Sequence, residues 1–182
     1  MRVVAGTARG VPLAAPRGSG TRPITDRVKE TLFAILGDRV PEARLLDLYA
    51  GSGAVGIEAL SRGATSVDFV ERDRAALAAL RDNLERTRLS ADARIHDADV
   101  ERYLAVTAAS DGPWDIVTLD PPYDVRAMVA PLRALVPHLA PGASVVLKHF
   151  WRTEPAELDG LTVVRQRRFG ETMLTFWELE AA

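Results

Sequence analysis

From residue 45 onward, short apolar runs alternate with stretches in which apolar residues recur every three or four positions. Five short runs predict β-strands, at residues 45–49, 67–71, 93–96, 116–119 and 144–147. Helices are predicted between them, at residues 54–62, 74–88, 99–107 and 125–139. Strands that alternate with helices form a parallel sheet with helices on both faces. The pattern therefore predicts a doubly wound α/β fold.

The end of the chain follows a different pattern. Two β-rich runs, at residues 161–167 and 172–179, are separated by Phe169-Gly170-Glu171. A turn between two such runs is typical of a hairpin rather than of another strand–helix unit. We therefore expect a mostly parallel sheet of seven strands that an antiparallel C-terminal hairpin completes at one edge.

The beginning of the chain is rich in Gly, Pro and Arg. Two short apolar runs, at residues 2–5 and 11–13, predict a small β-hairpin or a loose arm over residues 1–23. Thr25 or Asp26 can cap the helix that follows, and Gly37 can end it. Its predicted apolar face consists of Val28, Leu32, Ile35 and Leu36. We expect residues 24–182 to form the main domain.

Composition narrows the class of protein. The chain has 182 residues, of which 47% are hydrophobic and 26% charged, and this is typical of one globular domain. It has no cysteine, which excludes disulfides and thiolate ligands, and its three histidines have no metal-ligand spacing. No apolar run approaches the roughly 18 residues that span a bilayer, and residues 1–6 lack the long apolar stretch that is typical of a secretory signal. We expect a cytoplasmic monomer without a metal or a membrane partner.

Charge is distributed unevenly along the chain. The formal net charge is −2, but residues 1–30 carry six basic and two acidic side chains, and therefore +4. The remaining residues then carry −6. A basic arm on an acidic body is typical of a segment that contacts phosphates, and it is equally typical of a solvated arm. We expect five basic residues to contact phosphates: Arg2, Arg9, Arg22, Arg27 and Lys29.

A glycine motif follows the first strand and opens the next helix. Gly51, Gly53 and Gly56 satisfy the G-x-G-x-x-G spacing, and Glu71 ends the second strand 20 residues after Gly51. Glycines at these positions let the backbone approach a ligand, and a carboxylate at that spacing accepts hydrogen bonds from ribose hydroxyls. The segment is therefore predicted to bind a nucleoside.

Asp47 distinguishes between the possible cofactors. It stands four residues before Gly51, at the end of the first strand. A carboxylate there would repel the pyrophosphate of NAD but would suit the amino group of a methionine moiety. This favours S-adenosylmethionine over a nicotinamide cofactor. A nucleophile elbow at Ser52, with His149 as its base, is a further alternative, but it leaves Glu71 without a role.

A second motif, Asp120-Pro121-Pro122-Tyr123, comes directly after the fourth strand. The two prolines make a rigid turn at the sheet edge where ligands bind in doubly wound folds. The Asp120 carboxylate and the Pro121 carbonyl would hold an exocyclic amino group and align its lone pair with a sulfonium methyl. Tyr123 would offer a flat face to the target base. The motif predicts an amino-group methyltransferase.

These motifs resemble those of class I S-adenosylmethionine-dependent amino-group methyltransferases. The N-terminal residues narrow the resemblance to one family. The Asp-Pro-Pro-Tyr motif is shared by several amino-methylating families, whereas two runs are much more specific: Met1-Arg2-Val3-Val4-Ala5-Gly6 and Arg22-Pro23-Ile24-Thr25-Asp26-Arg27. Together with Gly56-Ile57-Glu58-Ala59-Leu60, they are similar to the RsmD-type 16S ribosomal RNA guanine-N2 methyltransferases over residues 1–180. The family resemblance implies that 16S ribosomal RNA, or the small ribosomal subunit, is the substrate.

The same resemblance implies roles for individual residues. Asp47, Gly51 and Gly53 would hold the methionine end of S-adenosylmethionine, and Glu71 would bind its ribose. Asp99 and the Val100 backbone would meet the adenine. The guanine would lie against three further residues: Asp120, Pro121 and Tyr123. One stretch departs from the family pattern, because Lys148-His149-Phe150-Trp151 stands where the family often has an acidic residue.

Other functions remain open on the sequence alone. DNA adenine-N6 or protein glutamine methylation would use the same Asp-Pro-Pro-Tyr motif, although DNA enzymes usually need an added recognition domain. An NAD-dependent oxidoreductase and a non-catalytic RNA-binding module in ribosome assembly are alternatives from other classes.

Overall fold

The computed structural model describes residues 1–16, 24–122, 125–153 and 157–180. Its centre is a seven-stranded sheet in the order β3-β2-β1-β4-β5-β7-β6. The strands are β1 (Arg44–Leu48), β2 (Ser66–Glu71), β3 (Ala93–Asp97), β4 (Trp114–Leu119), β5 (Leu139–Phe150), β6 (Leu161–Phe169) and β7 (Thr172–Leu179). The first five are parallel, and β7 lies antiparallel between β5 and β6. The predicted fold class is confirmed.

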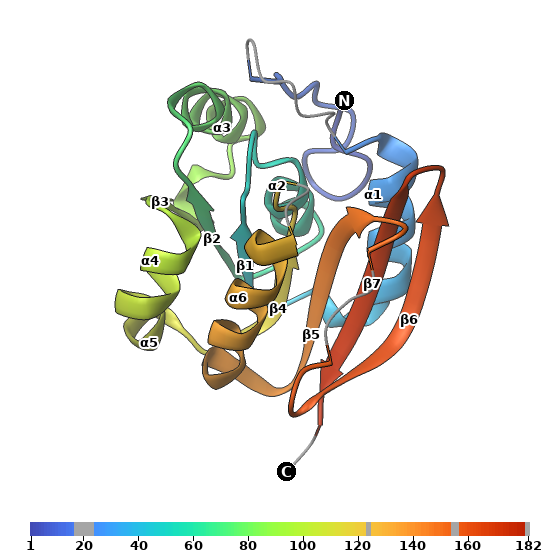
Figure 1. The fold of residues 1–182 in the computed structure, drawn as a ribbon. Helices are drawn as coiled ribbons and strands as arrows, with labels where there is room; N and C mark the ends of the chain where they lie inside the picture. The colour runs from blue at the N-terminus through green and yellow to red at the C-terminus, as the bar shows by residue number, and fades with distance from the viewer. Residues whose placement is uncertain (17–23, 123–124, 154–156, 181–182) are drawn as a thin grey trace.

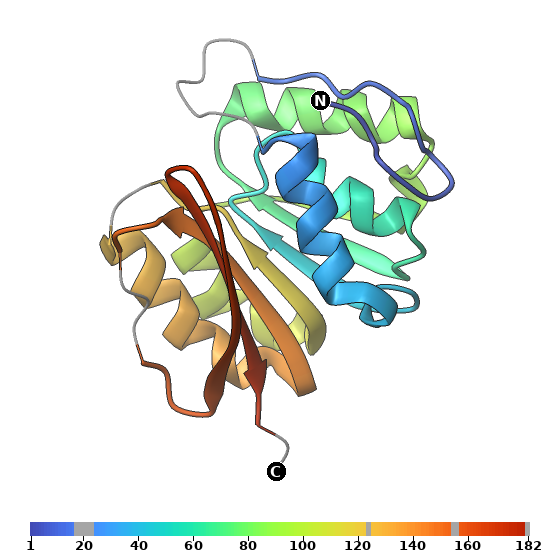
Figure 2. The ribbon, with the colours of Figure 1, turned by 90° about the vertical axis from the view of Figure 1, so that its right-hand side faces the viewer.

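Helices cover both faces of the sheet (Figures 1 and 2). One layer contains α1 (Asp26–Leu36), α2 (Ala54–Ser61) and α3 (Arg74–Thr87). The other layer contains α4 (Val100–Val106), α5 (Ala108–Asp111) and α6 (Val125–Leu135). Short 3₁₀ turns are η1 (Gly37–Arg39), η2 (Ser90–Asp92) and η3 (Val136–His138). None of the helices in the described part of the chain is long and apolar enough to cross a bilayer.

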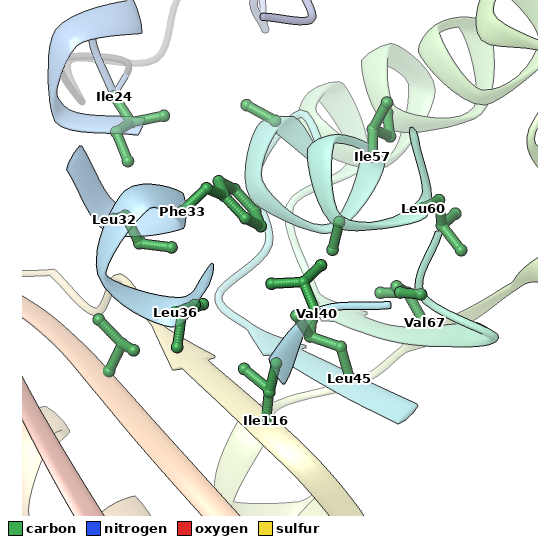
Figure 3. Close-up of a cluster of buried hydrophobic side chains, with 14 of the residues drawn as sticks. Ile24, Leu32, Phe33, Leu36, Val40, Leu45, Ile57, Leu60, Val67 and Ile116 are labelled. Carbon is green, nitrogen blue, oxygen red and sulfur yellow. The ribbon is translucent and has the colours of Figure 1, made fainter. Parts of the chain in front are cut away.

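The core divides into two clusters because neighbouring residues of a strand point to opposite faces. Leu45 and Ile116 pack under α1 and α2 with Phe33 and Ile57, as Figure 3 shows. Leu46 and Val117, one position further along the same strands, pack against α4 and α6. The sheet therefore packs between two apolar layers, and the polar residues at the ends of its strands are available to form the site.

The fifth strand is longer than the pattern predicted. The helix expected over residues 125–139 ends at Leu135, and β5 begins at Leu139 rather than at residue 144. Leu139 pairs with Trp114, and a register shift separates this pair from the regular ladder that starts at Ile116. The Pro141-Gly142 pair hid this early part of the strand, because both residue types are rare in strands.

The N-terminal residues form a hairpin that lies on the main domain. Arg2 pairs with Pro12 in an antiparallel bridge, and Val3 is fully buried. The Val4 and Ala5 amides donate to the two carboxylate oxygens of Glu58 at 2.8 and 2.9 Å. The hairpin reading of this segment is therefore correct, and the predicted boundary at residue 23 lies outside the described residues.

Lys29 is not the solvent-facing residue that the charge pattern predicted. Its side chain is 0% exposed, and its ammonium lies 3.0 Å from Glu58, which is equally buried. The ammonium also donates to the Arg2 carbonyl at 2.5 Å. Lys29 has no surface to offer an RNA phosphate, so that expectation is wrong. The residue joins α1, α2 and the hairpin instead.

Candidate active site

The predicted site residues gather at the carboxyl ends of the parallel strands. The strand order reverses between β1 and β4, and ligands bind at such a switch point in doubly wound sheets. The Asp120 amide donates to the Leu48 carbonyl at 3.3 Å, which holds the turn after β4 beside the turn after β1. The Ala50 amide likewise donates to the Val70 carbonyl at 3.1 Å, towards β2.

The glycine loop between β1 and α2 requires glycine at two positions. Gly51 and Gly53 have φ values of +56° and +77°, in the left-handed region that favours glycine. A Cβ on Gly53 would lie 2.2 Å from the Leu80 side chain of α3. A Cβ on Gly51 would meet nothing within 4 Å. Gly53 therefore serves packing, whereas Gly51 faces open space that a ligand can enter.

Asp47 is built into the frame of this loop. It is 4% exposed, and its carboxylate accepts from the Gly56 amide at 3.1 Å and from the Thr118 hydroxyl at 2.7 Å. Burial raises the pKa of Asp47 to about 7, and the negative charges of Asp120 and Glu71 add to this shift. Asp47 thus ties β1 to the start of α2 and to β4, and its contact with a methionine amino group stays a prediction.

Glu71 joins the loops that follow β1 and β2. One carboxylate oxygen accepts from the Gly51 amide at 2.8 Å. The other accepts from the Arg72 and Asp73 amides, both at 2.8 Å. Three backbone donors thus fix the carboxylate at the sheet edge. Because two oxygens offer about four lone-pair sites, one site remains for a ribose hydroxyl.

Asp99 stands after β3, where it caps α4. One oxygen accepts from the Glu101 and Arg102 amides, and the other accepts from the Arg72 guanidinium at 3.0 Å. The Asp99 side chain is 44% exposed, so it can still meet a ligand. Val100, the first residue of α4, is buried. The predicted adenine contacts therefore lie at the same edge as Glu71 and Gly51.

These residues fit S-adenosylmethionine by their chemistry. The loop offers open space above Gly51, and the surrounding acceptors are three carboxylates from three neighbouring strand ends: Asp47, Glu71 and Asp99. An ammonium group, ribose hydroxyls and an adenine amino group all donate hydrogen bonds to such acceptors. A pyrophosphate would be repelled by the same charges, which argues against NAD.

Asp120 forms an ion pair that the sequence did not reveal. Both of its carboxylate oxygens accept from the Lys148 ammonium of β5 at 2.7 Å. Burial raises the pKa of Asp120, and the Lys148 charge opposes this rise. The Asp120 side chain keeps 39% of its surface exposed, against 12% for Lys148. Pro121 is buried beside it, and Tyr123 lies outside the described residues.

The residues predicted to contact RNA phosphates have different environments. Arg2, Arg9 and Arg27 are exposed, and Arg22 lies outside the described residues. Arg2 forms an ion pair with Asp26 at 3.6 Å, at the start of α1. Arg2 and Arg9 belong to the N-terminal hairpin and Arg27 belongs to α1. The hairpin lies on the layer of α1, α2 and α3 (Figure 2). The RNA contacts of these arginines stay a prediction, and the buried Lys29 is no longer part of it.

Asn83 of α3 is a site residue that the patterns missed. It is fully buried, and its amide group donates to the Ser52 carbonyl at 2.9 Å. The same side chain accepts from the Ala14 amide at 2.7 Å and donates to the Ala14 carbonyl at 3.0 Å. Asn83 therefore connects the N-terminal hairpin with the glycine loop. The available signal was a polar residue beside Leu84 and Leu80 on the apolar face of a helix.

Two further features, a cluster of titratable side chains and a shallow pocket, lie outside the predicted site. Asp68, His96 and Asp111 approach one another closely, but the Asp68 carboxylate also accepts from the Trp114 indole and the Asp111 carboxylate from the Tyr103 hydroxyl. A shallow pocket of about 320 Å³ lies between Arg39 and Gly142, at the opposite edge of the sheet from Asp120. Neither feature contains a predicted site residue.

His149 and Ser52 do not form a nucleophile–base pair. His149 is 1% exposed and bonds the Thr175 hydroxyl through Nε2 at 2.8 Å. Burial lowers the pKa of His149, which keeps the imidazole neutral. Ser52 is 8% exposed at the glycine loop. His149 is thus a satisfied strand residue, and the hydrolase alternative has no support.

Comparison with known proteins supplies the family. The profile of the family described as "Conserved hypothetical protein 95" matches residues 1–178. The chain belongs to this family. "Putative rRNA methyltransferase YlbH" from Bacillus subtilis is 35% identical over 181 residues, which is 98% of each chain. "Ribosomal RNA small subunit methyltransferase D" from Escherichia coli K12 is 42% identical over 123 residues, 68% of this chain and 60% of that protein.

Solved structures agree with these relatives. "Putative methyltransferase yhhF" from Escherichia coli has a TM-score of 0.88 and 32% identity, and the match covers 100% of this chain and 99% of that one. "Putative methylase HI0767" from Haemophilus influenzae has a TM-score of 0.82 and 28% identity, covering 99% and 98%. The predicted RsmD-type family is confirmed, and with it the methyltransferase class.

Proposed function

We propose that this methyltransferase transfers a methyl group to N2 of a guanine in 16S ribosomal RNA. The observation that carries the proposal is the position of Asp120. Its carboxylate leaves the end of β4 beside the glycine loop, to which the Asp120 amide is joined through the Leu48 carbonyl at 3.3 Å. An amino group held by Asp120 would therefore lie next to a cofactor held by that loop.

S-adenosylmethionine supplies a methyl group on a positively charged sulfur. The residues of this chain supply the geometry: Glu71 and Asp99 bind hydroxyl and amino groups, and the backbone at Gly51 allows close approach. Asp120 and the Pro121 carbonyl accept the two N2 hydrogens of guanine and direct the nitrogen lone pair towards the methyl carbon. The C–N bond would form as the S–C bond breaks, S-adenosylhomocysteine would leave, and N2 would release one proton to water. Positioning of this kind contributes several kcal/mol to a transfer, about 7–11 at best.

The substrate and cellular context belong to the same proposal. The names of the two relatives refer to ribosomal RNA, which supports the small ribosomal subunit or its RNA as the partner. A cytoplasmic monomer without a metal ion fits an in-line transfer that needs only orientation. Tyr123 would stack on the target base, and Arg2, Arg9, Arg22 and Arg27 would contact phosphates nearby.

Mass spectrometry of ribosomal RNA tests the proposal. Small-subunit RNA from cells that lack the gene should lose one N2-methylguanine, and the purified protein should restore it in vitro. An unchanged nucleoside profile would overturn the assignment. The Asp120→Ala variant should bind S-adenosylhomocysteine normally but transfer no methyl group. An active Asp120→Ala enzyme would remove Asp120 from the mechanism.

A further inference from the structure

The edge strand β6 carries a concentration of arginine that the proposed mechanism does not use. All seven residues from Thr162 to Arg168 are exposed, and Figure 1 shows β6 at the open edge of the sheet. Arg165, Arg167 and Arg168 lie within this stretch, and Glu171 is the one acidic residue between positions 160 and 177. Within the described residues, no carboxylate forms an ion pair with these three arginines.

β6 ends at the same end of the sheet as Asp120, where the parallel strands have their carboxyl ends. Phe150, the last residue of β5, pairs with Thr172, and Thr172 pairs with Phe169 at the end of β6. One cross-strand row contains Arg167, Leu174 and Lys148, and Lys148 in turn reaches Asp120 on β4. Residues in such a row point to the same face, so Arg165 and Arg167 share the face of Lys148. Arg168, one position further on, points to the other face, so the arginines line the rim of β6 on both sides. Three strand spacings of about 4.8 Å separate β6 from β4, so the row is roughly 14 Å long.

Trp151 adds an aromatic group to this rim. The Arg168 guanidinium lies 3.6 Å from the centroid of the Trp151 ring, and the Arg152 guanidinium lies 4.9 Å from it. The Trp151 amide donates to the Glu171 carbonyl at 3.0 Å, which fixes the ring beside the β6–β7 turn. Arginine held against an aromatic ring is pre-organised, and both groups stack on nucleobases.

We propose that the Arg165–Arg168 stretch of β6 and the adjoining Trp151 form the surface that holds the RNA backbone beside the target nucleotide. The proposal rests on the proposed function, and it places the phosphate contacts on the opposite side of Asp120 from the glycine loop. Positive charge without acidic partners complements a polyanion, and phosphate contacts fix register without reading sequence. The N-terminal hairpin and α1, with Arg2 paired to Asp26 and Lys29 buried, then contribute less.

Binding of a labelled oligouridylate tests the surface independently of methyl transfer. The triple variant Arg165→Gln, Arg167→Gln, Arg168→Gln should bind roughly tenfold more weakly at low salt, and its log–log salt slope should flatten by about 2, from about 0.7 for each contact. A matched control removes three exposed arginines from α3 and α6: Arg81→Gln, Arg86→Gln and Arg133→Gln. Equal losses in the two variants would overturn the proposal, because net charge alone would then explain both.

Trp151 provides a second readout. Trp114 and Trp177 are 0% and 1% exposed, so acrylamide quenching of tryptophan fluorescence in the wild-type protein reports mainly on Trp151. RNA should protect this fluorescence in the wild type and in the control variant. Unchanged quenching at saturating RNA would contradict the proposal. So would a wild type that sediments as a dimer and a triple variant that sediments as a monomer, since the edge strand would then pair with a second copy.

These outcomes separate the surface from the proposed function. If guanine methylation fails but the triple variant loses RNA affinity, the surface stands and the reaction is different. If the wild type methylates ribosomal RNA and the triple variant does so with unchanged RNA affinity, the reaction stands and the surface is wrong. S-adenosylhomocysteine binding should be the same in all three proteins, which confirms that each is folded.

Discussion

Lys148 holds Asp120 through both carboxylate oxygens, each 2.7 Å from the ammonium. The pair joins β5 to the end of β4, at the residue that the proposed mechanism places against the target amino group. A lysine that occupies one side of the carboxylate leaves the remaining lone pairs for substrate and fixes their direction. Lys148 is therefore a positioning residue in the proposed reaction, and it belongs to the stretch Lys148-His149-Phe150-Trp151, at which the sequence departs from the family resemblance.

Replacement of Lys148 by Met should shift the pH dependence of transfer. Burial raises the pKa of Asp120, and Lys148 opposes this rise; the variant removes only the opposing charge. The pKa of Asp120 then rises further, so the acid limb of the kcat profile should move to higher pH. At neutral pH we expect a roughly tenfold to hundredfold loss of kcat, as for removal of a hydrogen-bonded charge worth about 1.5–3 kcal/mol.

Lys148→Arg is the matched control for this shift. It retains the positive charge, so its acid limb should stay near that of the wild type even if its kcat falls. The Asp47 carboxylate of β1, which also interacts with the Asp120 charge, is unchanged in both variants. Identical pH profiles for Lys148→Met and the wild type would show that Lys148 does not act through Asp120.

Asp47 should make the stability of the protein depend on pH. In the unfolded chain its pKa is 3.8, whereas burial raises the folded-state pKa to about 7. Between these values Asp47 is deprotonated in the unfolded chain but still protonated in the folded protein. The contribution of Asp47 to the free energy of unfolding is therefore highest at low pH and falls as the pH rises towards 7. Asp47→Asn has no such proton and can keep bonds to Gly56 and Thr118. From pH 5 to pH 8, urea unfolding should show the wild type losing about 2 kcal/mol relative to the variant.

The opposite trend would contradict this assignment. If the wild type gains stability relative to Asp47→Asn as pH rises, the Asp47 carboxylate is better stabilised in the folded protein than in the unfolded chain. The hydrogen bond from Thr118 provides an internal check, because it lowers the pKa of Asp47. Thr118→Val should therefore enlarge the pH-dependent loss.

Asn83 should couple the N-terminal hairpin to cofactor binding. Asn83→Asp keeps the shape of the side chain but replaces the group that donates to the Ser52 and Ala14 carbonyls with an acceptor. The unsatisfied carbonyls should cost about 2 kcal/mol of unfolding free energy and distort the glycine loop. We expect a lower Tm and roughly tenfold weaker S-adenosylhomocysteine binding by calorimetry, at about 1.4 kcal/mol for each factor of ten.

The neighbouring Asp82→Asn is the control for Asn83. The Asp82 side chain is 46% exposed and pairs with Arg86 on the helix surface, so both measurements should stay at wild-type values. If Asn83→Asp binds S-adenosylhomocysteine as the wild type does, the hairpin is not coupled to the loop. Deletion of residues 1–20 would then leave the affinity for S-adenosylhomocysteine unchanged, as expected for an arm that does not contact the site.

The sequence predicted the parallel strands and the two turns that bear the site, because these depend on local patterns. The glycine loop and the Asp120 turn both lie where short apolar runs end. Long-range polar contacts were not predictable in the same way. Lys148 and Asp120 are 28 positions apart, and Asn83 reaches Ala14 across 69 positions. Such partners become visible only when the strand order brings them together.

The error at Lys29 has a specific cause. The predicted apolar face of this helix rests on the assumption that charged residues face water, and it consists of Val28, Leu32, Ile35 and Leu36. The buried face of α1 contains Val28, Lys29, Leu32, Phe33 and Leu36. Phe33 lies one helical turn after Lys29, so the pair marks the same side of the helix. Glu58 gave a second signal, since it is the one charged residue of an otherwise apolar α2. Two unexplained charges on buried helices indicate an ion pair.

Breaking this ion pair should destabilise the protein without changing RNA contacts. Lys29→Met leaves Glu58 buried, with Arg62 at 2.9 Å and the Val4 and Ala5 amides as its remaining partners. Loss of one partner from a buried pair typically costs about 3–5 kcal/mol, and we expect the lower end because these partners stay. Urea unfolding of Lys29→Met should show this loss, whereas Arg27→Gln, at an exposed neighbouring position, should unfold as the wild type does.

RNA binding by the same two variants separates the structural role of Lys29 from the phosphate contact that the charge pattern suggested. Below its unfolding transition, Lys29→Met should bind oligouridylate with the wild-type salt slope, because the ammonium is 0% exposed and cannot release a counterion from RNA. Arg27→Gln removes an exposed charge and can only flatten that slope. A Lys29→Met protein that is as stable as the wild type but binds RNA more weakly would show that Lys29 faces the RNA after all.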